Sequence, residues 1–410
     1  MKNIYDLAII GGGAAGLSAC AAASGAGDRA VILEGSSSVG RKIMASGNGR
    51  CNLMNTGAPR YFGSPSFAQD VLSRCGAGEQ IRFWRSIGLE LAEEEDGRMY
   101  PCTFQAASVL DVLKREIGSR NAEVRLNTRI SKCRKMPDGL FLLEADDGNK
   151  ICARRVLIAS GGAAALKPGS AESGYGILKE FGHTIHPVFP ALVPMETDSR
   201  SISGLSGIRV RCTVTLLDRS GTRLHRETGE VLFTDTGVSG ICIMQCARFI
   251  SGEGCCLELD LADRLFPDDP ALSDELKRRM EQYPDSDAKT MLVGLVPAKV
   301  SYAVMKQAGI PLRGEKLGEV PQSSIPALVH AMRHYRIEVS GTRGMESAQV
   351  TAGGVSCDEF RQDNMESLLV PGLHAAGEIL DVDGDCGGFN LMFAFGSGIL
   401  AGLNGRKPGF

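Results

Sequence analysis

The chain has 410 residues, of which 43% are hydrophobic and 23% are charged, and its formal net charge is −3. This size predicts two or three domains with a sizeable core. The 45 basic and 48 acidic residues are balanced and form no conspicuous basic block, so neither nucleic acid nor an anionic membrane is expected as a partner. Because no apolar run is long and uninterrupted enough to span a bilayer, a membrane-embedded protein is not expected either.

The cysteine pattern indicates the compartment. Thirteen cysteines are scattered through the chain without a Cys-x-x-Cys pair or the spacing of a zinc site, so we expect no metal. Residues 7–27 carry no charge and follow Lys2, as in a secretory signal, but three glycines interrupt the apolar stretch. We therefore predict a cytoplasmic protein with free thiols.

Residues 6–16 predict an apolar strand that runs into a glycine turn. The turn has the spacing G-x-G-x-x-G of a dinucleotide-binding motif. The first glycine permits a tight turn, the second lets the backbone approach a pyrophosphate, and the third lets the next helix lie close to the sheet. The positive N-terminal end of that helix is then directed at the pyrophosphate. The expected cofactor contacts are Gly11, Gly13, Ala14, Ala15 and Gly16.

A second strand is predicted over 30–33 and is followed by Glu34, 18 residues after Gly16. A carboxylate at this spacing accepts hydrogen bonds from the adenosine ribose hydroxyls and would repel a ribose phosphate, which favours FAD or NAD over NADP. Gly35, the next residue, belongs to the same set of expected cofactor contacts.

Further elements continue the α/β pattern up to residue 190. A helix is predicted over 105–118, and strands are predicted over 123–130, 141–145 and 155–162. Ile130 ends the strand that in this kind of fold usually offers its backbone to the adenine, although core burial explains this residue equally well. Ser160 and Gly161 end the strand nearest the cofactor, where small residues suit contact with FAD, although a plain turn is the simpler interpretation.

The composition changes after residue 190, where alternating apolar residues over 210–216 predict a half-buried strand. Thr228–Gly229 predicts the turn of a hairpin before a strand over 230–234. Helical segments are predicted from residue 267 onward, where Asp268, Asp269 and Pro270 form a helix start, and over 288–308 and 324–334. Since the α/β pattern returns near residue 350, an insertion of roughly 150 residues interrupts the first domain.

The last part of the chain contains a second glycine-rich strand end, over 371–390. It resembles the segment that closes over the ribityl chain and ring of FAD in large flavoproteins. An apolar helix is predicted over 389–404, and its N-terminal dipole would stabilise negative charge on reduced flavin. Acidic side chains in this segment could bind ribityl or ribose hydroxyls. The expected contacts are Gly377, Glu378, Asp385, Gly388, Asn390 and Leu391.

Three segments, over 40–52, 229–240 and 377–390, strongly resemble motifs of one bacterial flavoprotein family. Its members are NAD(P)/FAD-dependent oxidoreductases, and they include aminoacetone-oxidase-like enzymes and the dehydro-bile-acid reductases of gut anaerobes. The similarity extends over nearly the whole chain. It does not fix the substrate, because the activities within this family are diverse.

The resemblance implies an α/β fold with a Rossmann-like FAD-binding domain of the two-dinucleotide-binding flavoprotein type. It places this domain over 1–190 and 340–410, a β-barrel-like inserted domain over 191–262 that residues near 310–339 complete, and a helical subdomain over 263–309. It also indicates that a cationic, amide-rich loop contacts the cofactor through Arg41, Lys42, Ser46, Gly47, Asn48, Cys51 and Asn52.

No catalytic acid or base stands out. Tyr100, His186 and Cys386 are weak candidates by residue type, and a structural role explains each of them at least as well. We expect FAD as the cofactor, which carries the redox chemistry itself. NAD(P)H is expected only as a transient electron donor, because no second strand-glycine-helix unit is visible in the sequence.

Three functions remain open. The first is reduction of an enone or a similar conjugated carbonyl in a small hydrophobic substrate, such as a dehydro-bile acid. The second is an FAD-dependent amine oxidase that releases peroxide, which the flavin motifs fit equally well. The third is a flavin-binding RNA-modification or assembly factor, which the balanced charge disfavours. The sequence does not predict the oligomeric state.

Overall fold

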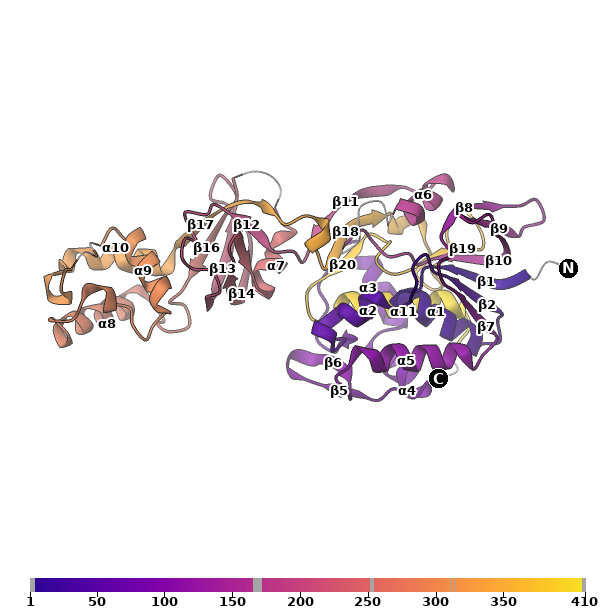
Figure 1. Cartoon of the computed structure of the whole chain (residues 1–410), viewed down its shortest axis with the longest axis horizontal. Coiled ribbons are helices and arrows are strands. Elements are labelled where there is room, and N and C mark those ends of the chain that lie inside the picture. The colour runs from indigo at the N-terminus through magenta and orange to yellow at the C-terminus, as the bar shows by residue number, and fades with distance from the viewer. Residues whose placement is uncertain (1–3, 165–171, 251–253, 311, 313, 408–410) are drawn as a thin grey trace. The chain divides into compact units, whose positions relative to one another are not determined.

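The computed structural model describes residues 4–164, 172–250, 254–310, 312 and 314–407. The chain divides into two compact units (Figure 1). The first unit combines Met1–Phe189 with Val350–Phe410, and the second unit is Pro190–Gln349.

A seven-stranded sheet forms the centre of the first unit. Its order is β7 (Ala122–Arg125), β2 (Ala30–Leu33), β1 (Ile4–Ile10), β10 (Lys150–Ile158), β9 (Phe141–Ala145) and β8 (Ile130–Lys135), and β19 (Leu373–Ala375) also pairs with β10. The pairs β7–β2, β2–β1, β1–β10 and β10–β19 are parallel, whereas β10–β9 and β9–β8 are antiparallel. The four residues of β2 are all buried and apolar, as expected for a parallel strand that is covered on both faces.

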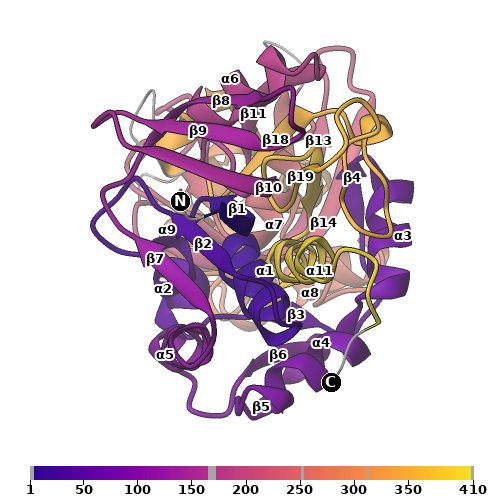
Figure 2. The same cartoon turned by 90° about the vertical axis from the view of Figure 1, so that its right-hand side faces the viewer.

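Two helices from opposite ends of the chain, α1 (Ala14–Gly25) and α11 (Phe389–Leu403), lie side by side in this unit (Figure 2). Small residues permit this close approach: a Cβ added at Gly398 or Gly402 would overlap a backbone carbonyl oxygen of α1. The other helices of this unit are α2 (Arg41–Ala45), α3 (Pro65–Arg74), α4 (Ala77–Ser86), α5 (Ala106–Gly118) and α6 (Glu172–Glu180).

Three small sheets complete the first unit. They are β3 (Met54–Asn55), β6 (Arg98–Pro101) and β5 (Leu91–Glu93); β20 (Val382–Gly384) with β4 (Tyr61–Gly63); and β11 (Ile185–Ala191) with β18 (Val350–Val355). The last of these sheets joins the two chain segments from which the second unit departs and to which it returns.

The second unit contains a closed barrel. Its strand order is β12 (Met195–Thr197), β15 (Gly237–Ser239), β14 (Arg223–Phe233), β13 (Arg209–Leu217), β16 (Cys256–Asp260) and β17 (Tyr335–Thr342). Along β13 the apolar side chains at alternate positions, from Val210 to Leu216, are buried inside it. The closing strand β17 comes from a segment about 75 residues after β16, because a helical region separates them.

The helices of the second unit are α7 (Ile241–Ala247), α8 (Asp269–Gln282), α9 (Ala298–Gln307) and α10 (Ile325–Arg333). The predicted start of α8 is confirmed, since the Asp268 side chain caps this helix by accepting a hydrogen bond from the Ala271 N–H at 2.9 Å. Short 3-10 turns are η1 (Ser46–Gly49), η2 (Glu95–Gly97), η3 (Ala288–Thr290), η4 (Leu317–Glu319), η5 (Gln322–Ser324), η6 (Met345–Ser347) and η7 (Cys357–Glu359). Among the described residues, no helix has the length and hydropathy needed to cross a membrane.

The predicted fold class is confirmed: an α/β unit is interrupted by a barrel and a helical region. The single strand predicted over 123–130 is wrong. The chain leaves the sheet after β7 because Asn127 adopts a left-handed conformation (φ 52°) and its N–H donates to the Ser36 carbonyl oxygen. Ile130 therefore begins β8 instead of ending the previous strand.

The hairpin turn predicted at Thr228–Gly229 is also wrong. Both residues lie inside the long strand β14, and the actual turn lies over 218–222. Gly229 instead allows α7 to lie close to this part of the strand. A Cβ added at Gly229 would be 3.1 Å from the Cβ of Cys242 in α7. The glycine therefore marks a close contact between elements and not a turn.

Candidate cofactor site

The glycine turn after β1 is shaped by close backbone contacts. Gly11 has a φ of +108°, and a Cβ there would overlap the Ala159 carbonyl oxygen. Its N–H donates to the Leu33 carbonyl oxygen at 3.0 Å, which ties the turn to β2. A Cβ at Gly16 would overlap the carbonyl oxygen of Gly11. The first and third glycines of the motif are therefore required by the turn and by helix α1.

Gly13 differs from these two glycines because open space surrounds it. A Cβ at this position would meet nothing within 4 Å. Gly13 also precedes α1 as its N-cap, and within the described part of the chain no side-chain cap binds the first N–H groups of this helix, those of Ala14, Ala15 and the following residue. An uncapped helix start beside open space fits the pyrophosphate of a dinucleotide.

Glu34 lies directly beside this turn. One carboxylate oxygen accepts a hydrogen bond from the Gly12 N–H at 2.7 Å. The other accepts from the N–H of Ser36 at 2.8 Å and from its hydroxyl at 2.7 Å. Gly35, between these residues, is exposed, and a Cβ there would be 3.5 Å from the Cβ of Arg129. The carboxylate is thus held next to the phosphate turn, where a ribose is expected.

The loop that follows α2 is rich in left-handed residues. Gly47, Asn48 and Cys51 have φ values of 55°, 54° and 57°. The Ser46 hydroxyl donates to the Ile43 carbonyl oxygen at 2.7 Å, and the Ser46 carbonyl oxygen accepts from the Cys51 N–H at 3.1 Å. Burial raises the pKa of the Cys51 thiol to about 11, so this thiol is neutral.

Asn52 ends this loop with a buried side-chain oxygen that has no hydrogen-bond partner among the described residues. A Cβ at Gly388 would lie 2.7 Å from that oxygen, so the loop and the start of α11 are adjacent. A buried acceptor without a partner is costly, and a donor on a bound cofactor would remove the cost. This atom therefore fits a polar cofactor at the point where the two motifs meet.

An ion pair joins two of the predicted site segments. The Lys42 ammonium lies 2.7 Å from one carboxylate oxygen of Glu378, and the other oxygen accepts from the Thr351 N–H at 2.9 Å. Arg41, the neighbour of Lys42, is exposed at the start of α2. The structure thus brings Lys42 and Glu378 together, with the carboxylate engaged by protein groups.

Side chains of the C-terminal segment over 377–391 mainly bind other groups of the protein close to this segment. Asp385 pairs with Arg60 at 2.6 Å. The Asn390 amide accepts from the Gly384 N–H and donates to the Gly384 carbonyl oxygen, both at 2.8 Å. Gly388 has a φ of +105° and is the N-cap of α11, again without a side-chain cap, so Leu391 lies in an uncapped first turn. The segment is therefore a tightly folded lead into a helix whose first N–H groups no side chain binds.

The remaining predicted contacts are dispersed. Ile130 is buried and pairs with Ala145 of β9. The loop before Ile130 contacts the residue after β2, because the Thr128 N–H donates to the Glu34 carbonyl oxygen at 2.8 Å. The Ser160 hydroxyl is buried and has no partner among the described residues. Gly161 follows it with a φ of +76°, and Gly377 lies against Ala15 of α1. The adenine contact expected at Ile130 therefore stays a prediction, whereas Ser160 resembles Asn52 in lacking a partner among the described residues.

The three catalytic candidates have different surroundings. Tyr100 is buried, and the Arg50 guanidinium covers its ring at 4.5 Å from the centroid. Burial raises the pKa of the Cys386 thiol. His186 is 45% exposed and its Nδ1 lies 2.7 Å from a carboxylate oxygen of Asp381. Of the three, His186 alone has a partner among the described residues that could orient it as a proton donor.

Several residues of this region were not predicted from the sequence. Asp381 was not predicted, although it orients His186. Asn55 donates from its side-chain amide to the Gly387 carbonyl oxygen at 2.9 Å and so fixes the turn before α11. The Tyr175 hydroxyl is buried without a partner among the described residues, and burial raises the pKa of this hydroxyl. The spacing of the C-terminal motif could have indicated Asp381, but the other two lie in segments without a recognisable pattern.

Comparison with known proteins identifies the family. The model of the HI0933-like protein Rossmann domain matches residues 5–404. The chain belongs to this family. It is 36% identical over 407 residues to the 3-dehydro-bile acid delta(4,6)-reductase of Clostridium scindens, and the match covers 97% of this chain and 98% of that protein. It is also 30% identical over 408 residues to the ribosomal RNA dihydrouridine synthase of Escherichia coli, with 96% of each chain covered. The predicted family resemblance is confirmed.

Solved structures resemble the chain more distantly. The 3-ketosteroid delta1-dehydrogenase from Sterolibacterium denitrificans is 13% identical, with 98% of this chain and 99% of that chain covered and a TM-score of 0.48. A flavocytochrome c3 fumarate reductase is 15% identical, with 98% of this chain and 78% of that chain covered and the same TM-score.

The residues described above fit FAD. The phosphate turn has an open approach at Gly13, and the acid Glu34 lies beside it. Asn52 and Ser160 present buried polar atoms that lack partners among the described residues. The Rossmann assignment of the family agrees with this fit. FAD is therefore the cofactor that this site accommodates.

Proposed function

We propose that this chain, an FAD-dependent oxidoreductase, reduces a carbon–carbon double bond conjugated to a carbonyl in a small hydrophobic substrate such as a dehydro-bile acid. The observation that carries this proposal is the 36% identity to a 3-dehydro-bile acid delta(4,6)-reductase along 97% of the chain. The substrate in that enzyme's name is a conjugated ketone, and the match leaves no large part of either chain unpaired. The candidate cofactor site fits FAD, which carries the required redox chemistry.

The proposed cofactor contacts are the glycine turn, Glu34, the loop over 41–52 and the segment over 377–391. Reduction of an enone adds a hydride to the carbon β to the carbonyl and a proton to the α carbon. Bound FAD supplies the hydride once it has been reduced. The chain must therefore hold the carbonyl and deliver one proton.

Among the three candidates, His186 suits proton delivery best. Its Nδ1 is engaged by Asp381, which leaves Nε2 to present a proton. The paired carboxylate orients the imidazole. Tyr100 and Cys386 lack such a partner in the described structure, and burial disfavours ionisation of the Cys386 thiol.

The test uses the flavin-loaded protein under anaerobic conditions. The flavin is first reduced chemically and then mixed with a dehydro-bile acid or with the matching saturated ketone. We expect the enone alone to reoxidise the flavin, with a product heavier by two hydrogen atoms. If no conjugated ketone reoxidises the flavin, the proposal is wrong. Peroxide release with small aminoketones would instead indicate an amine oxidase.

The electron donor is proposed to be NAD(P)H, bound only transiently. Stopped-flow mixing of the oxidised protein with NADH or NADPH measures how fast each one bleaches the flavin. We expect one nicotinamide to reduce the flavin faster than the other. If neither reduces it, the electrons come from a different donor.

A second candidate function is supported by two relatives. The Escherichia coli and Haemophilus influenzae proteins, 30% and 29% identical to this chain, are both named ribosomal RNA dihydrouridine synthases. The C5–C6 double bond of uracil is conjugated to the C4 carbonyl, so its reduction is the same hydride and proton addition. Incubation of the reduced protein with ribosomal RNA, followed by mass analysis of its nucleosides, distinguishes this substrate from a bile acid.

A further inference from the structure

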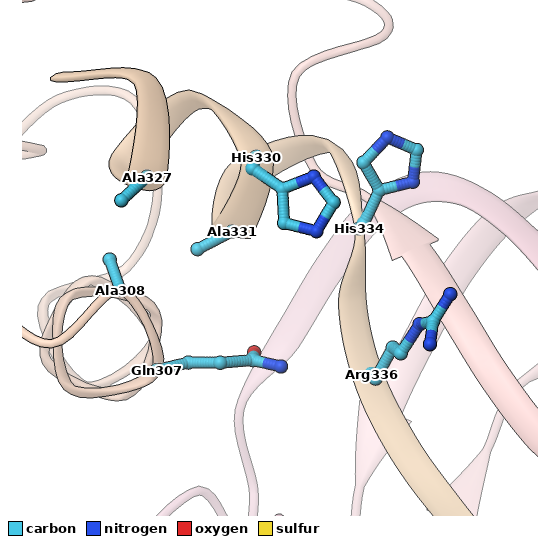
Figure 3. Close-up of a pocket in the computed structure, with 7 residues that line it drawn as sticks. All are labelled: Gln307, Ala308, Ala327, His330, Ala331, His334 and Arg336. Atoms are coloured by element: carbon cyan, nitrogen blue, oxygen red, sulfur yellow. The ribbon is translucent and has the colours of Figure 1, made fainter.

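A surface pocket lies in the helical part of the second unit. Its volume is about 250 Å³, and its lining comes from α9, α10 and the start of β17 (Figure 3). The polar groups around it are amide, imidazole and guanidinium groups. The lining residues are Gln307, Ala308, Ala327, His330, Ala331, His334 and Arg336.

A single acid orients two of these polar groups. One Glu258 oxygen lies 2.9 Å from His334 Nδ1, and the other lies 3.1 Å from Arg336 Nε. The guanidinium keeps further N–H groups for a ligand, because only its Nε is used in this pair. The ring of His330 lies 4.7 Å from that of His334, measured between centroids. The pocket therefore presents several oriented donors to the same space.

The two helical segments that form the pocket contain no acidic residue, although Glu258 of β16 binds His334 and Arg336. Neither 288–314 nor 320–337 includes an aspartate or a glutamate, although the whole chain has 48 of them. On α9, Lys299, Tyr302 and Lys306 follow the spacing i, i+3, i+7 and share one face, and all three are exposed. Among the described residues, neither of these lysines forms an ion pair. This part of the surface thus presents three positively charged side chains, Lys299, Lys306 and Arg336, of which only Arg336 is paired with a carboxylate in the described structure.

We propose that the pocket and the exposed face of α9 bind the phosphodiester backbone of RNA. Arginine, histidine and amide donors bind phosphate oxygens, and the two lysines add phosphate contacts along an extended ligand. The half-exposed Tyr302 ring lies between them and suits stacking on a base. A lone phosphate would need only the pocket, whereas the lysine and tyrosine face extends beyond it. The proposal rests on the second candidate function, in which uridine in RNA is the substrate.

The test measures RNA binding by the full flavin-loaded chain. Fluorescence anisotropy with a short labelled single-stranded RNA gives Kd over a range of KCl concentrations. In the double variant Lys299→Glu/Lys306→Glu we expect Kd to rise at least about 10-fold, and the slope of log K against log salt to become less negative by about two. Arg336→Gln and Tyr302→Ala should each weaken binding without changing flavin absorbance.

Lys277→Glu on α8 is the matched control, because this lysine is exposed in the same unit and pairs only with Asp274 in the described structure. The control should leave Kd unchanged. Equal weakening by the control and the double variant would overturn the proposal, as would absence of RNA binding by the wild type. Inorganic phosphate that binds the pocket tightly while RNA does not bind would also overturn it.

The outcome is separable from the catalytic proposal. Reoxidation of reduced flavin is assayed with free enones and with uridine, neither of which needs the α9 face. RNA binding without reoxidation supports the surface and contradicts the proposed function. Reoxidation by an enone without RNA binding supports the proposed function and contradicts the proposed RNA-binding surface.

Discussion

Gly13 and Gly16 belong to one motif but have different surroundings, which makes a matched pair of substitutions informative. Gly13→Val adds a side chain to open space, so the protein should fold normally but exclude the pyrophosphate. Gly16→Val would overlap the Gly11 carbonyl oxygen, so it should impair folding as well. Thermal melting and flavin absorbance of the purified proteins check both results. Full flavin content in Gly13→Val would contradict the assignment of this turn.

Glu34→Ala tests the ribose contact. A charge-assisted hydrogen bond contributes about 1.5–3 kcal/mol, so the affinity for FAD should fall by about 10- to 150-fold. Titration of the cofactor-free protein with FAD measures this change. Ser36→Ala is the control, because it removes one partner of the carboxylate without removing the carboxylate. If only the affinity for a nicotinamide changed, the turn would hold that cofactor instead.

His374 makes stability depend on pH. Burial lowers the pKa of its imidazole from 6.5 to about 4, with a smaller contribution from Arg155. Below pH 6.5 the imidazole is protonated in the unfolded state, whereas in the folded state it stays neutral down to about pH 4. The free energy of unfolding therefore falls as the pH drops from 6.5 to about 4, by about 3 kcal/mol from this group. Urea unfolding at both ends of the window measures the change, which should shrink in His374→Leu and persist in the exposed control His330→Leu.

At the scale of elements, the contact between α1 and α11 gives a second matched pair. Gly398 lies against Ala15 in the first turn of α1, whereas Gly402 lies against Ala19 one turn further along. Overpacking costs typically about 1–3 kcal/mol, so Gly398→Ala and Gly402→Ala should both lower Tm. Only Gly398→Ala should also weaken FAD binding, since it displaces the helix start at the phosphate turn. Equal flavin affinity in the two variants would show that this helix contact does not support the turn.

The sequence predicted those elements whose signals are local. The glycine spacing predicted β1 and α1, and Asp268 predicted the start of α8, because each depends on neighbours within a few residues. The break after β7 was missed because Asn127 is held by Ser36, which is distant in sequence. The Gly229 error has a similar cause, since the helix that requires this glycine is a tertiary neighbour.

The same limit applies to the site. Lys42 and Glu378 could each be selected from motifs, but their ion pair joins residues 336 positions apart and required the structure. The two exposed lysines of α9 could be read from the sequence, but the balanced total charge gave no reason to select them. The structure was needed to show that residues of α9, α10 and β17 line one pocket.

At the scale of the whole molecule, the two units should be separable. Strands β11 and β18 pair within the first unit, so the chain leaves and re-enters it at adjacent points. Replacing 190–349 by a short glycine-serine linker should give a folded protein that still binds FAD, because no predicted cofactor contact lies in the removed part. Absorbance and circular dichroism check this. A colourless but folded product would show that the second unit contributes to the cofactor site.

The contact between α1 and α11 also has a consequence for biogenesis. Translation delivers the phosphate turn well before α11 and the segment that precedes it. Contacts between segments so distant in sequence carry a high loop-closure cost during folding. A copy released before α11 lacks the proposed cofactor contacts over 377–391. We expect such a copy to bind flavin poorly, so that flavin retention reports whether both segments are present.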